Sequence, residues 1–202
     1  MLNTGDAPPL SYTVVPGATL RDVARDLGGR GLLSRPTYLV WWALLQSKLE
    51  GKAYTIKVGE YALTPGMTAS QLLDNMAAGK VLQYSLTLVE GWTFKQMMAA
   101  INAHPALTHT LTGLTGDQVM TRLGWPDQHP EGRFYPDTYS FSRGLSDVVF
   151  LQRAYRMMEQ RLAKEWPQRD VSVPYKTPYE ALIMASIVER ETGVAAERPQ
   201  IA

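Results

Sequence analysis

Apolar and polar positions alternate in a way that predicts repeated strand-to-helix units in the first half of the chain. Runs with period-two alternation and β-branched or aromatic residues predict strands. These runs are residues 12–15, 54–58, 61–63 and 84–89. Amphipathic runs with helical spacing follow, so the pattern predicts three strand-to-helix units.

A Gly-x-Thr sequence joins strand to helix in each unit. The copies are Gly17-Ala18-Thr19, Gly66-Met67-Thr68 and Gly91-Trp92-Thr93, followed three residues after the threonine by Asp22, Gln71 and Gln96. A threonine with an acid or amide three positions later is a capping box, in which each side chain bonds to the other residue's backbone N–H. Each copy therefore predicts a helix that begins directly after its threonine.

Three further helices are predicted. Leucine and aromatic residues at helical spacing predict one over 36–49. Ser146 is a suitable N-cap for a second, which runs to near Glu165. A third begins after Thr177, where proline takes the first helical position and Glu180 the third.

A glycine- and proline-rich stretch, residues 113–136, is predicted to be loop. Short strands and helices are segregated along the chain, which favours an α+β fold over a doubly wound parallel sheet. We expect a disordered tail at 1–10, a small domain with an inserted helix at 11–85, and a second mixed α+β domain at 86–202.

Composition narrows the possible functions. The net charge of +1 over 202 residues gives no reason to expect a nucleic-acid or anionic-membrane partner, and membrane contact is expected only through a transmembrane helix outside these residues. The chain has no cysteine, which excludes disulfides, thiolate zinc sites and cysteine nucleophiles. Its three histidines match no metal motif, and no phosphate loop is present, so no metal or cofactor is predicted. The longest apolar run, residues 38–45, is too short to span a bilayer, and no secretory signal is visible.

The helix after Thr177 carries the main candidate for chemistry. At about 100° per residue, Glu191 falls within the apolar sector, whereas Glu189 points to roughly the opposite side. That sector is formed by Ile183, Met184, Ile187 and Val188. A carboxyl group on an apolar sector is costly to ionise and keeps a proton available, as a general acid requires. The alternative is that Glu191 marks where the helix emerges from the core, with Gly193 as its stop.

A second candidate segment, residues 131–141, interleaves aromatic rings with polar groups. Glu131, Tyr135, Asp137 and Tyr139 could form a sugar-binding wall, because ring faces pack on pyranose C–H groups while polar ends meet hydroxyls. The alternative is a turn at 135–137 that leads into an edge strand whose aromatic residues are core.

Four ordered blocks together resemble a known family. They are Val89-Glu90-Gly91-Trp92-Thr93, Glu131-Gly132-Arg133-Phe134-Tyr135-Pro136-Asp137-Thr138-Tyr139, Ala185-Ser186-Ile187-Val188-Glu189-Arg190-Glu191-Thr192 and Glu197-Arg198. In this order and spacing they resemble the membrane-anchored endolytic murein transglycosylases, the MltG (YceG-like) family. The first part, from about residue 11, resembles a LysM peptidoglycan-binding module interrupted by an inserted helix.

The resemblance implies a lytic transglycosylase that cleaves the bond between N-acetylmuramic acid and N-acetylglucosamine inside nascent peptidoglycan strands. The products carry 1,6-anhydro ends, and the reaction is expected to terminate glycan elongation. One glutamic acid suffices and no cofactor is needed; the family's catalytic residue matches Glu191, with Glu189 as the fallback. The implied partners are glycan strands and peptidoglycan synthases (penicillin-binding proteins). The implied location is the bacterial inner membrane, single-pass, with this part in the periplasm.

Two departures from the family are expected to matter. Its N-terminal transmembrane helix and the C-terminal part of its catalytic domain have no counterpart here, which predicts a fragment and an incomplete catalytic domain. The rival from another class is a non-catalytic cell-wall binding module or scaffold. A hydrolytic muramidase, which releases reducing rather than anhydro ends, is a second rival.

Overall fold

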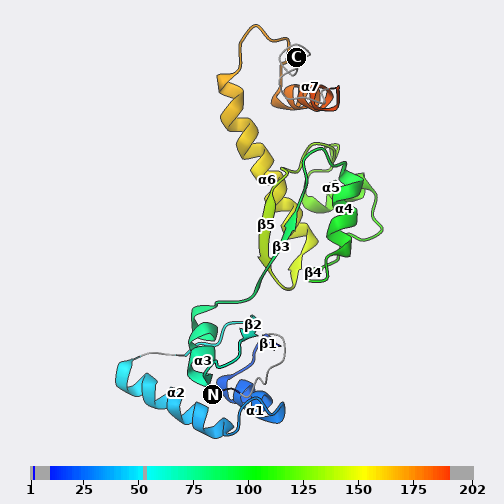
Figure 1. Cartoon of the computed structure of the whole chain (residues 1–202). Coiled ribbons are helices and arrows are strands. Elements are labelled where there is room, and N and C mark those ends of the chain that lie inside the picture. The colour runs from blue at the N-terminus through cyan, green and yellow to red at the C-terminus, as the bar shows by residue number, and fades with distance from the viewer. Residues whose placement is uncertain (1, 3–9, 52–53, 192–202) are drawn as a thin grey trace. The chain divides into compact units, whose positions relative to one another are not determined.

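The computed structural model describes residues 2, 10–51 and 54–191. The chain divides into two compact units, Met1–Tyr84 and Ser85–Ala202, and each contains helices and short strands (Figure 1). The strands of the described residues form three two-stranded sheets: β1 with β2, β3 with β5, and β4 with β6. Short sheets interspersed with helices confirm the predicted α+β class.

The first unit is built on an antiparallel strand pair. β1 (Leu10–Val14) pairs with β2 (Gly59–Leu63), and Tyr12 lies opposite Tyr61. Both tyrosines face inward with the apolar sides of α1 (Leu20–Gly29) and α3 (Ala69–Ala78). The buried residues of this core are Leu2, Tyr12, Val14, Val23, Leu27, Tyr61, Leu63, Leu72 and Met76. This unit therefore has its own hydrophobic core.

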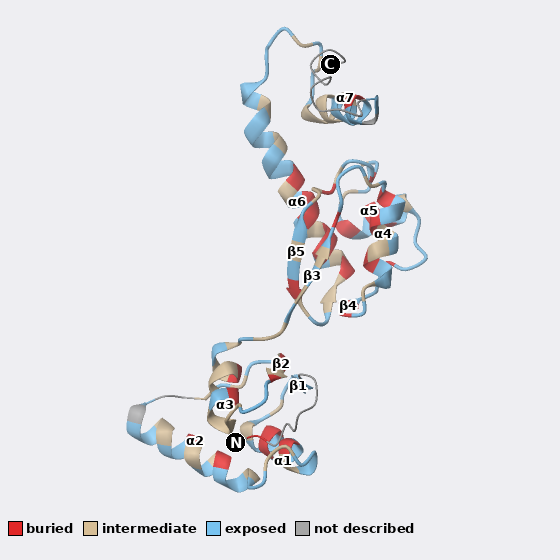
Figure 2. Cartoon of the chain, viewed as in Figure 1, coloured by how far each residue is buried: buried red, intermediate tan, exposed pale blue. Residues whose placement is uncertain are grey.

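The predicted inserted helix is confirmed as α2 (Pro36–Glu50). It ends at Gly51, whose φ of 65° is the left-handed conformation that a glycine cap adopts readily. Leu39 and Ala43 are buried against Ala24 and Leu73. The other residues of 36–49 are half-buried or exposed (Figure 2).

The second unit begins within β3 and contains the remaining elements. They are β3 (Gln83–Thr87), α4 (Phe94–Ala103), β4 (Leu107–Thr108), α5 (Gly116–Leu123), β5 (Thr138–Ser142), β6 (Leu145–Ser146), α6 (Asp147–Glu165), the 3₁₀ turn η1 (Trp166–Gln168) and α7 (Pro178–Glu191). β4 and β6 are parallel, with Leu107 opposite Leu145. Phe150 of α6 is fully buried, and the rings of Tyr139 and Phe141 meet it edge-on. These aromatic contacts fix β5 against α6.

A buried carboxylate ties the start of α6 to the segment after β4. Asp147 is completely buried, and its oxygens accept hydrogen bonds from the backbone N–H groups of Thr110, Leu111 and Val148 and from the Thr110 hydroxyl. The four distances lie between 2.6 and 2.9 Å. A buried charge needs such partners, so Asp147 is a structural residue.

All three predicted capping boxes are present. Thr19, Thr68 and Thr93 each accept from the third helical residue, whose side chain accepts from the threonine N–H. A fourth box at Thr115 and Gln118 opens α5. Residues 113–136 are therefore not all loop, and the prediction was wrong at 116–123. The signal was the same Gly-x-Thr sequence, Gly113-Leu114-Thr115.

Two other predictions differ from the structure. Residues 54–58 are not a strand, because Lys57 donates its backbone N–H to the Met76 carbonyl at the end of α3 instead of to a neighbouring strand. Of the predicted disordered tail, residues 1–10, the structure describes Leu2 and Leu10. Leu2 is buried in the core and Leu10 begins β1, so both lie in folded structure.

Candidate active site

The helix that carries both candidate glutamates starts as the sequence predicted. The Thr177 hydroxyl accepts a hydrogen bond from the backbone N–H of Glu180 at 3.2 Å. The Glu180 carboxylate accepts from the backbone N–H of Lys176 at 2.7 Å. These two bonds satisfy backbone donors at the start of α7 and place a negative charge in its first turn, where the helix dipole favours it.

α7 contacts the loop of the second candidate segment through its first two turns. The Tyr179 hydroxyl donates to the Glu131 carbonyl at 3.1 Å. The guanidinium of Arg133 lies 3.6 Å from the centre of the Tyr179 ring. Leu182 packs over Gly132, where an added Cβ would lie 3.4 Å from its Cδ2 atom. The structure thus brings together two segments that lie more than 40 residues apart in the sequence.

Arg133 is the central side chain of this contact. Its side chain is 15% exposed, and one nitrogen lies 3.9 Å from the Glu159 carboxylate on α6. Its Nε atom is buried and has no hydrogen-bond partner among the described residues. A planar guanidinium suits this position because it can stack on a ring while its edge faces a carboxylate. Arg133 therefore connects α7, the 131–133 loop and α6.

Glu131 has a structural partner. Its carboxylate accepts from the backbone N–H of Phe94, the first residue of α4, at 2.9 Å. The dipole of a helix stabilises a negative charge at that end. The Gly91-Trp92-Thr93 motif lies directly before Phe94, so two of the motif blocks noted in the sequence meet at Glu131.

The other candidate sugar-binding residues lie in the irregular segment that leads into β5 and in β5 itself. The Tyr139 hydroxyl donates to the Tyr135 carbonyl at 2.7 Å, and its ring packs against Phe150. Burial, together with the charges of Asp137 and Tyr135, raises the pKa of Tyr139 well above its ordinary value. The exposed Asp137 accepts from the Thr138 N–H at 2.7 Å. Tyr139 is therefore largely a packing residue, whereas Asp137 and half-buried Tyr135 still reach the surface.

The expected burial of Glu191 is wrong, since both Glu189 and Glu191 are exposed. Val188 of the predicted apolar sector is buried, but Ile183 and Ile187 are exposed. The reason is the side through which α7 contacts its neighbours. At about 100° per residue, Glu189 lies on the same side as Leu182, and Glu191 lies on the opposite side. The side of α7 that meets residues 131–133 thus carries Glu189, whereas buried Val188 lies nearer the side of Glu191.

Comparison with known proteins identifies the family. The model of the YceG-like family matches residues 12–202. The chain belongs to the YceG-like family. A crystal structure of a yceG-like protein from Listeria monocytogenes is similar, with 20% sequence identity and a TM-score of 0.41. That match covers 94% of this chain and 66% of the Listeria chain. Among curated proteins, none matches this chain.

The site of this YceG-like chain contains contacts that the sequence did not single out. Arg133 and Tyr179 were not among the candidate residues, although Arg133 stands inside the aromatic segment and Tyr179 two residues after a helix cap. Their pairing depends on the fold and has no signal in sequence spacing. Within the described part of the chain, no group of three or more His, Asp and Glu residues could hold a metal ion. No described helix is long and apolar enough to cross a membrane.

Proposed function

We propose that this YceG-like chain is part of a lytic transglycosylase that cleaves glycan strands of nascent peptidoglycan and so terminates their elongation. The family match over residues 12–202 is the observation that carries the proposal. The contacts of α7 support it, since they hold the first turns of a helix with two exposed carboxylates against residues 131–133, within the aromatic candidate segment.

The proposed reaction needs one carboxyl group that gives and then takes a proton. The protonated acid gives its proton to the glycosidic oxygen between N-acetylmuramic acid and N-acetylglucosamine, and the bond from that oxygen to the muramoyl C1 breaks. The resulting carboxylate then takes the proton of the muramoyl 6-hydroxyl as O6 bonds to C1. The 1,6-anhydro ring closes, the carboxyl group is protonated again, and no water is consumed.

We assign the acid–base role to Glu191 on the motif, with Glu189 as the alternative. The motif match favours the second glutamate, whereas the helical geometry puts Glu189 on the side of α7 that contacts residues 131–133. The two variants Glu191→Gln and Glu189→Gln separate these assignments.

The first unit is proposed to be the LysM-like part that holds peptidoglycan. Its β1–α1 and β2–α3 connections both carry the Gly-x-Thr sequence and a capping box, as expected of a small module with repeated strand-to-helix turns. The proposed setting is the periplasmic side of the bacterial inner membrane, reached by a single-pass anchor, with peptidoglycan synthases as partners.

The test is digestion of purified peptidoglycan by the full-length protein, with products identified by mass spectrometry. Anhydro-muramoyl products from the parent, none from Glu191→Gln and normal yields from Glu189→Gln support the assignment. Glu165→Gln, an exposed carboxylate near the end of α6, is the matched control and should cleave normally. The reverse result for the two glutamates assigns the role to Glu189.

Other products would favour the rival functions. Reducing muramic ends, heavier than the anhydro products by one water, would identify a hydrolytic muramidase. Binding of muropeptides without any cleavage by the full-length protein would identify a cell-wall binding module or scaffold.

A further inference from the structure

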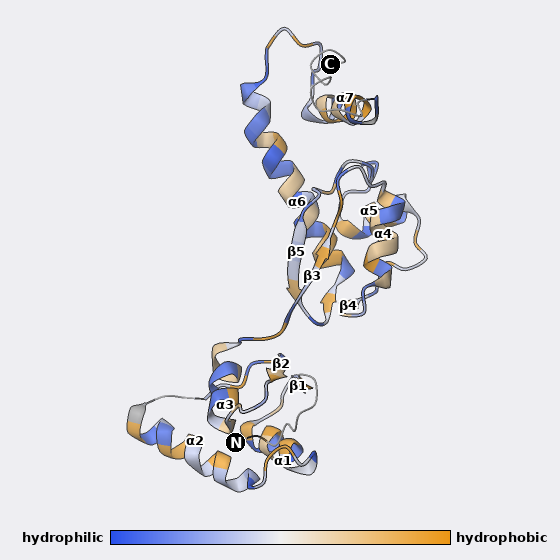
Figure 3. Ribbon diagram, viewed as in Figure 1, coloured by the Kyte–Doolittle hydropathy of each residue, from blue (hydrophilic) through white to orange (hydrophobic). Residues whose placement is uncertain are grey.

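Helix α2 exposes a continuous apolar face in the first unit. Tyr38, Trp41 and Leu49 are 69%, 74% and 72% exposed, and Leu44 and Leu45 are also exposed. At about 100° per residue, positions 38, 41, 45 and 49 lie along one side of the helix. We call Tyr38, Trp41, Leu45 and Leu49 the α2 stripe. The hydropathy colouring shows apolar residues along α2 (Figure 3).

The α2 stripe is not needed for the folding of its unit. α2 packs through Leu39 and Ala43, which lie on a different side of the helix. Monomeric soluble proteins rarely expose contiguous apolar patches of this kind, and such patches mark interaction surfaces. The α2 stripe therefore marks a surface that binds something other than the hydrophobic core of its own unit.

The charged residues around the α2 stripe indicate what kind of surface it binds. Residues 31–50 contain two cations, Arg35 and Lys48, and one acidic residue, Glu50, which is the last residue of α2. Both cations are exposed, one at each end of the stripe. Tryptophan and tyrosine prefer the boundary between acyl chains and headgroups, and flanking lysine or arginine pairs with anionic lipid. An apolar stripe with aromatic residues and cations at both ends complements an anionic phospholipid surface.

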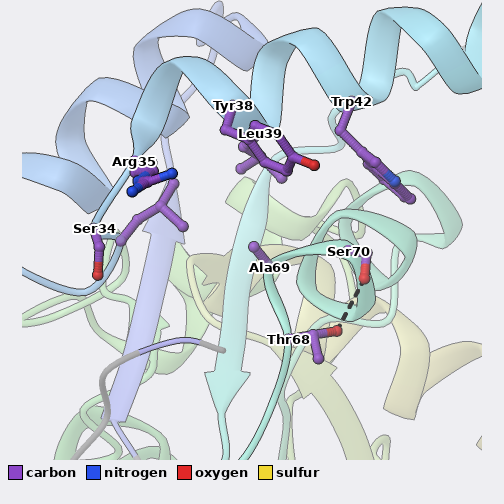
Figure 4. A pocket seen from close by; sticks show the side chains of 9 residues that line it. Ser34, Arg35, Tyr38, Leu39, Trp42, Thr68, Ala69 and Ser70 are labelled. Atoms are coloured by element: carbon purple, nitrogen blue, oxygen red, sulfur yellow. Dashed lines mark hydrogen bonds between the residues drawn. The ribbon is translucent and has the colours of Figure 1, made fainter.

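A cavity of about 360 Å³ adjoins the first turn of α2. Figure 4 shows Tyr38 and Trp42 of α2 on one side and Thr68, Ala69 and Ser70 on the other, with Ser34 and Arg35 at the end. The Thr68 and Ser70 hydroxyls lie 3.0 Å apart. The cavity thus puts hydroxyls and a guanidinium next to Tyr38, which suits a polar headgroup at the end of an apolar stripe.

We propose that α2 lies in the surface of an anionic phospholipid bilayer, with Tyr38, Trp41, Leu45 and Leu49 inserted and Arg35 and Lys48 against the headgroups. The stripe extends over 12 residues, from Tyr38 to Leu49, or about 17 Å at 1.5 Å rise per residue, which is too short to cross a bilayer and long enough to lie in its surface. This contact is separate from the proposed transglycosylase site and from any spanning anchor. It departs from the expectation drawn from net charge, because it depends on the residues gathered on one helix and not on the charge of the whole chain.

The test is flotation of the 202-residue chain with vesicles of phosphatidylglycerol and of phosphatidylcholine. The chain should float with phosphatidylglycerol vesicles, and Leu45→Ser/Leu49→Ser should lower the partition coefficient at least about tenfold, since two leucine side chains no longer enter the bilayer. Arg35→Gln/Lys48→Gln should lower it about tenfold or more at low salt, because each cation near an anionic surface contributes about 1 kcal/mol, or roughly fivefold.

Val15→Ser/Val58→Ser is the matched control, because it removes two exposed apolar side chains of the same unit outside α2. It should bind like the parent. Equal thermal unfolding of all variants shows that the substitutions leave the fold intact. Absence of flotation, or equal flotation of the leucine variant, overturns the proposal. So does a vesicle-free dimer that the leucine variant loses, which assigns the stripe to a second copy of the chain.

Discussion

The contact between Arg133 and Tyr179 gives the sharpest test of how α7 is held. Replacing Arg133 by Met keeps most of the side-chain stem and removes the charge 3.6 Å from the Tyr179 ring. Replacing Tyr179 by Ala removes the ring and also the hydroxyl that donates to Glu131. We expect both changes to weaken the contact of α7 with the 131–133 loop and to leave the core of α6 unaffected.

The magnitude follows from burial and geometry. A cation–π pair contributes about 0.5–1 kcal/mol at exposed sites and about 2 kcal/mol when desolvated. The Arg133 side chain is 15% exposed, so a coupling of about 1–2 kcal/mol is expected. The Tyr179 hydroxyl contributes a further ~1 kcal/mol. Because 1.4 kcal/mol is a factor of ten, Arg133→Met should lower the protection of α7 about tenfold and Tyr179→Phe about threefold to fivefold.

Hydrogen exchange of the backbone amides measures this local opening directly. Amides of α7 report the contact, and those around Phe150, in the buried half of α6, are the internal control. The double variant Arg133→Met/Tyr179→Ala should lose less protection than the sum of the two single variants, since each removes the same pair. Additive losses, or unchanged exchange in α7, would refute the reasoning.

Three further predictions concern stability. Asp147→Asn should lower the free energy of unfolding by about 3 kcal/mol in urea titrations, because the amide NH₂ would face N–H and O–H donors whose hydrogen bonds the buried carboxylate now accepts. Asp117→Asn, at an exposed position, is its control. A loss below about 1 kcal/mol for Asp147→Asn would contradict the burial argument. Burial, then the hydrogen bond and charge of Asp26, raises the pKa of Tyr12 to about 12, so stability should fall as the pH rises from about 10 to about 12. Tyr12→Phe should flatten this decline, and an unchanged slope would assign it to other groups. Thr115→Ala should cost about 1 kcal/mol and Thr115→Ser should restore it, as measured by thermal unfolding; equal stabilities would show that the fourth capping box is unimportant.

Local chemistry explains the predictions that succeeded. The starts of α1, α3 and α4 follow from Gly-x-Thr and a residue three positions later, and all the groups involved lie within one helical turn. α2 lies where the helical spacing of leucine and aromatic residues indicated, and α6 and α7 begin where a hydroxyl residue indicated. The same rule would have found α5, so its omission was an error of reading and not a limit of the sequence.

Predictions failed where the structure of a segment depends on its contacts with another helix or strand. Residues 54–58 have the composition of a strand, but the Lys57 N–H finds its acceptor at the end of α3, which no strand propensity specifies. The apolar sector of α7 predicted burial around Glu191, yet the helix contacts the rest of its unit through Tyr179 and Leu182. A helical period gives the direction of each side chain relative to the others; it does not say which side meets another element.

The sequence by itself determined where helices start, the α+β class and the residue types available for acid–base chemistry, because these depend on groups close together in the chain. Only the tertiary structure decided that Arg133 stacks on Tyr179, that the Glu131 carboxylate is held at the start of α4, and that the α2 stripe stays exposed. Those outcomes depend on contacts between segments far apart in sequence, whose geometry is set by the packing of the whole unit.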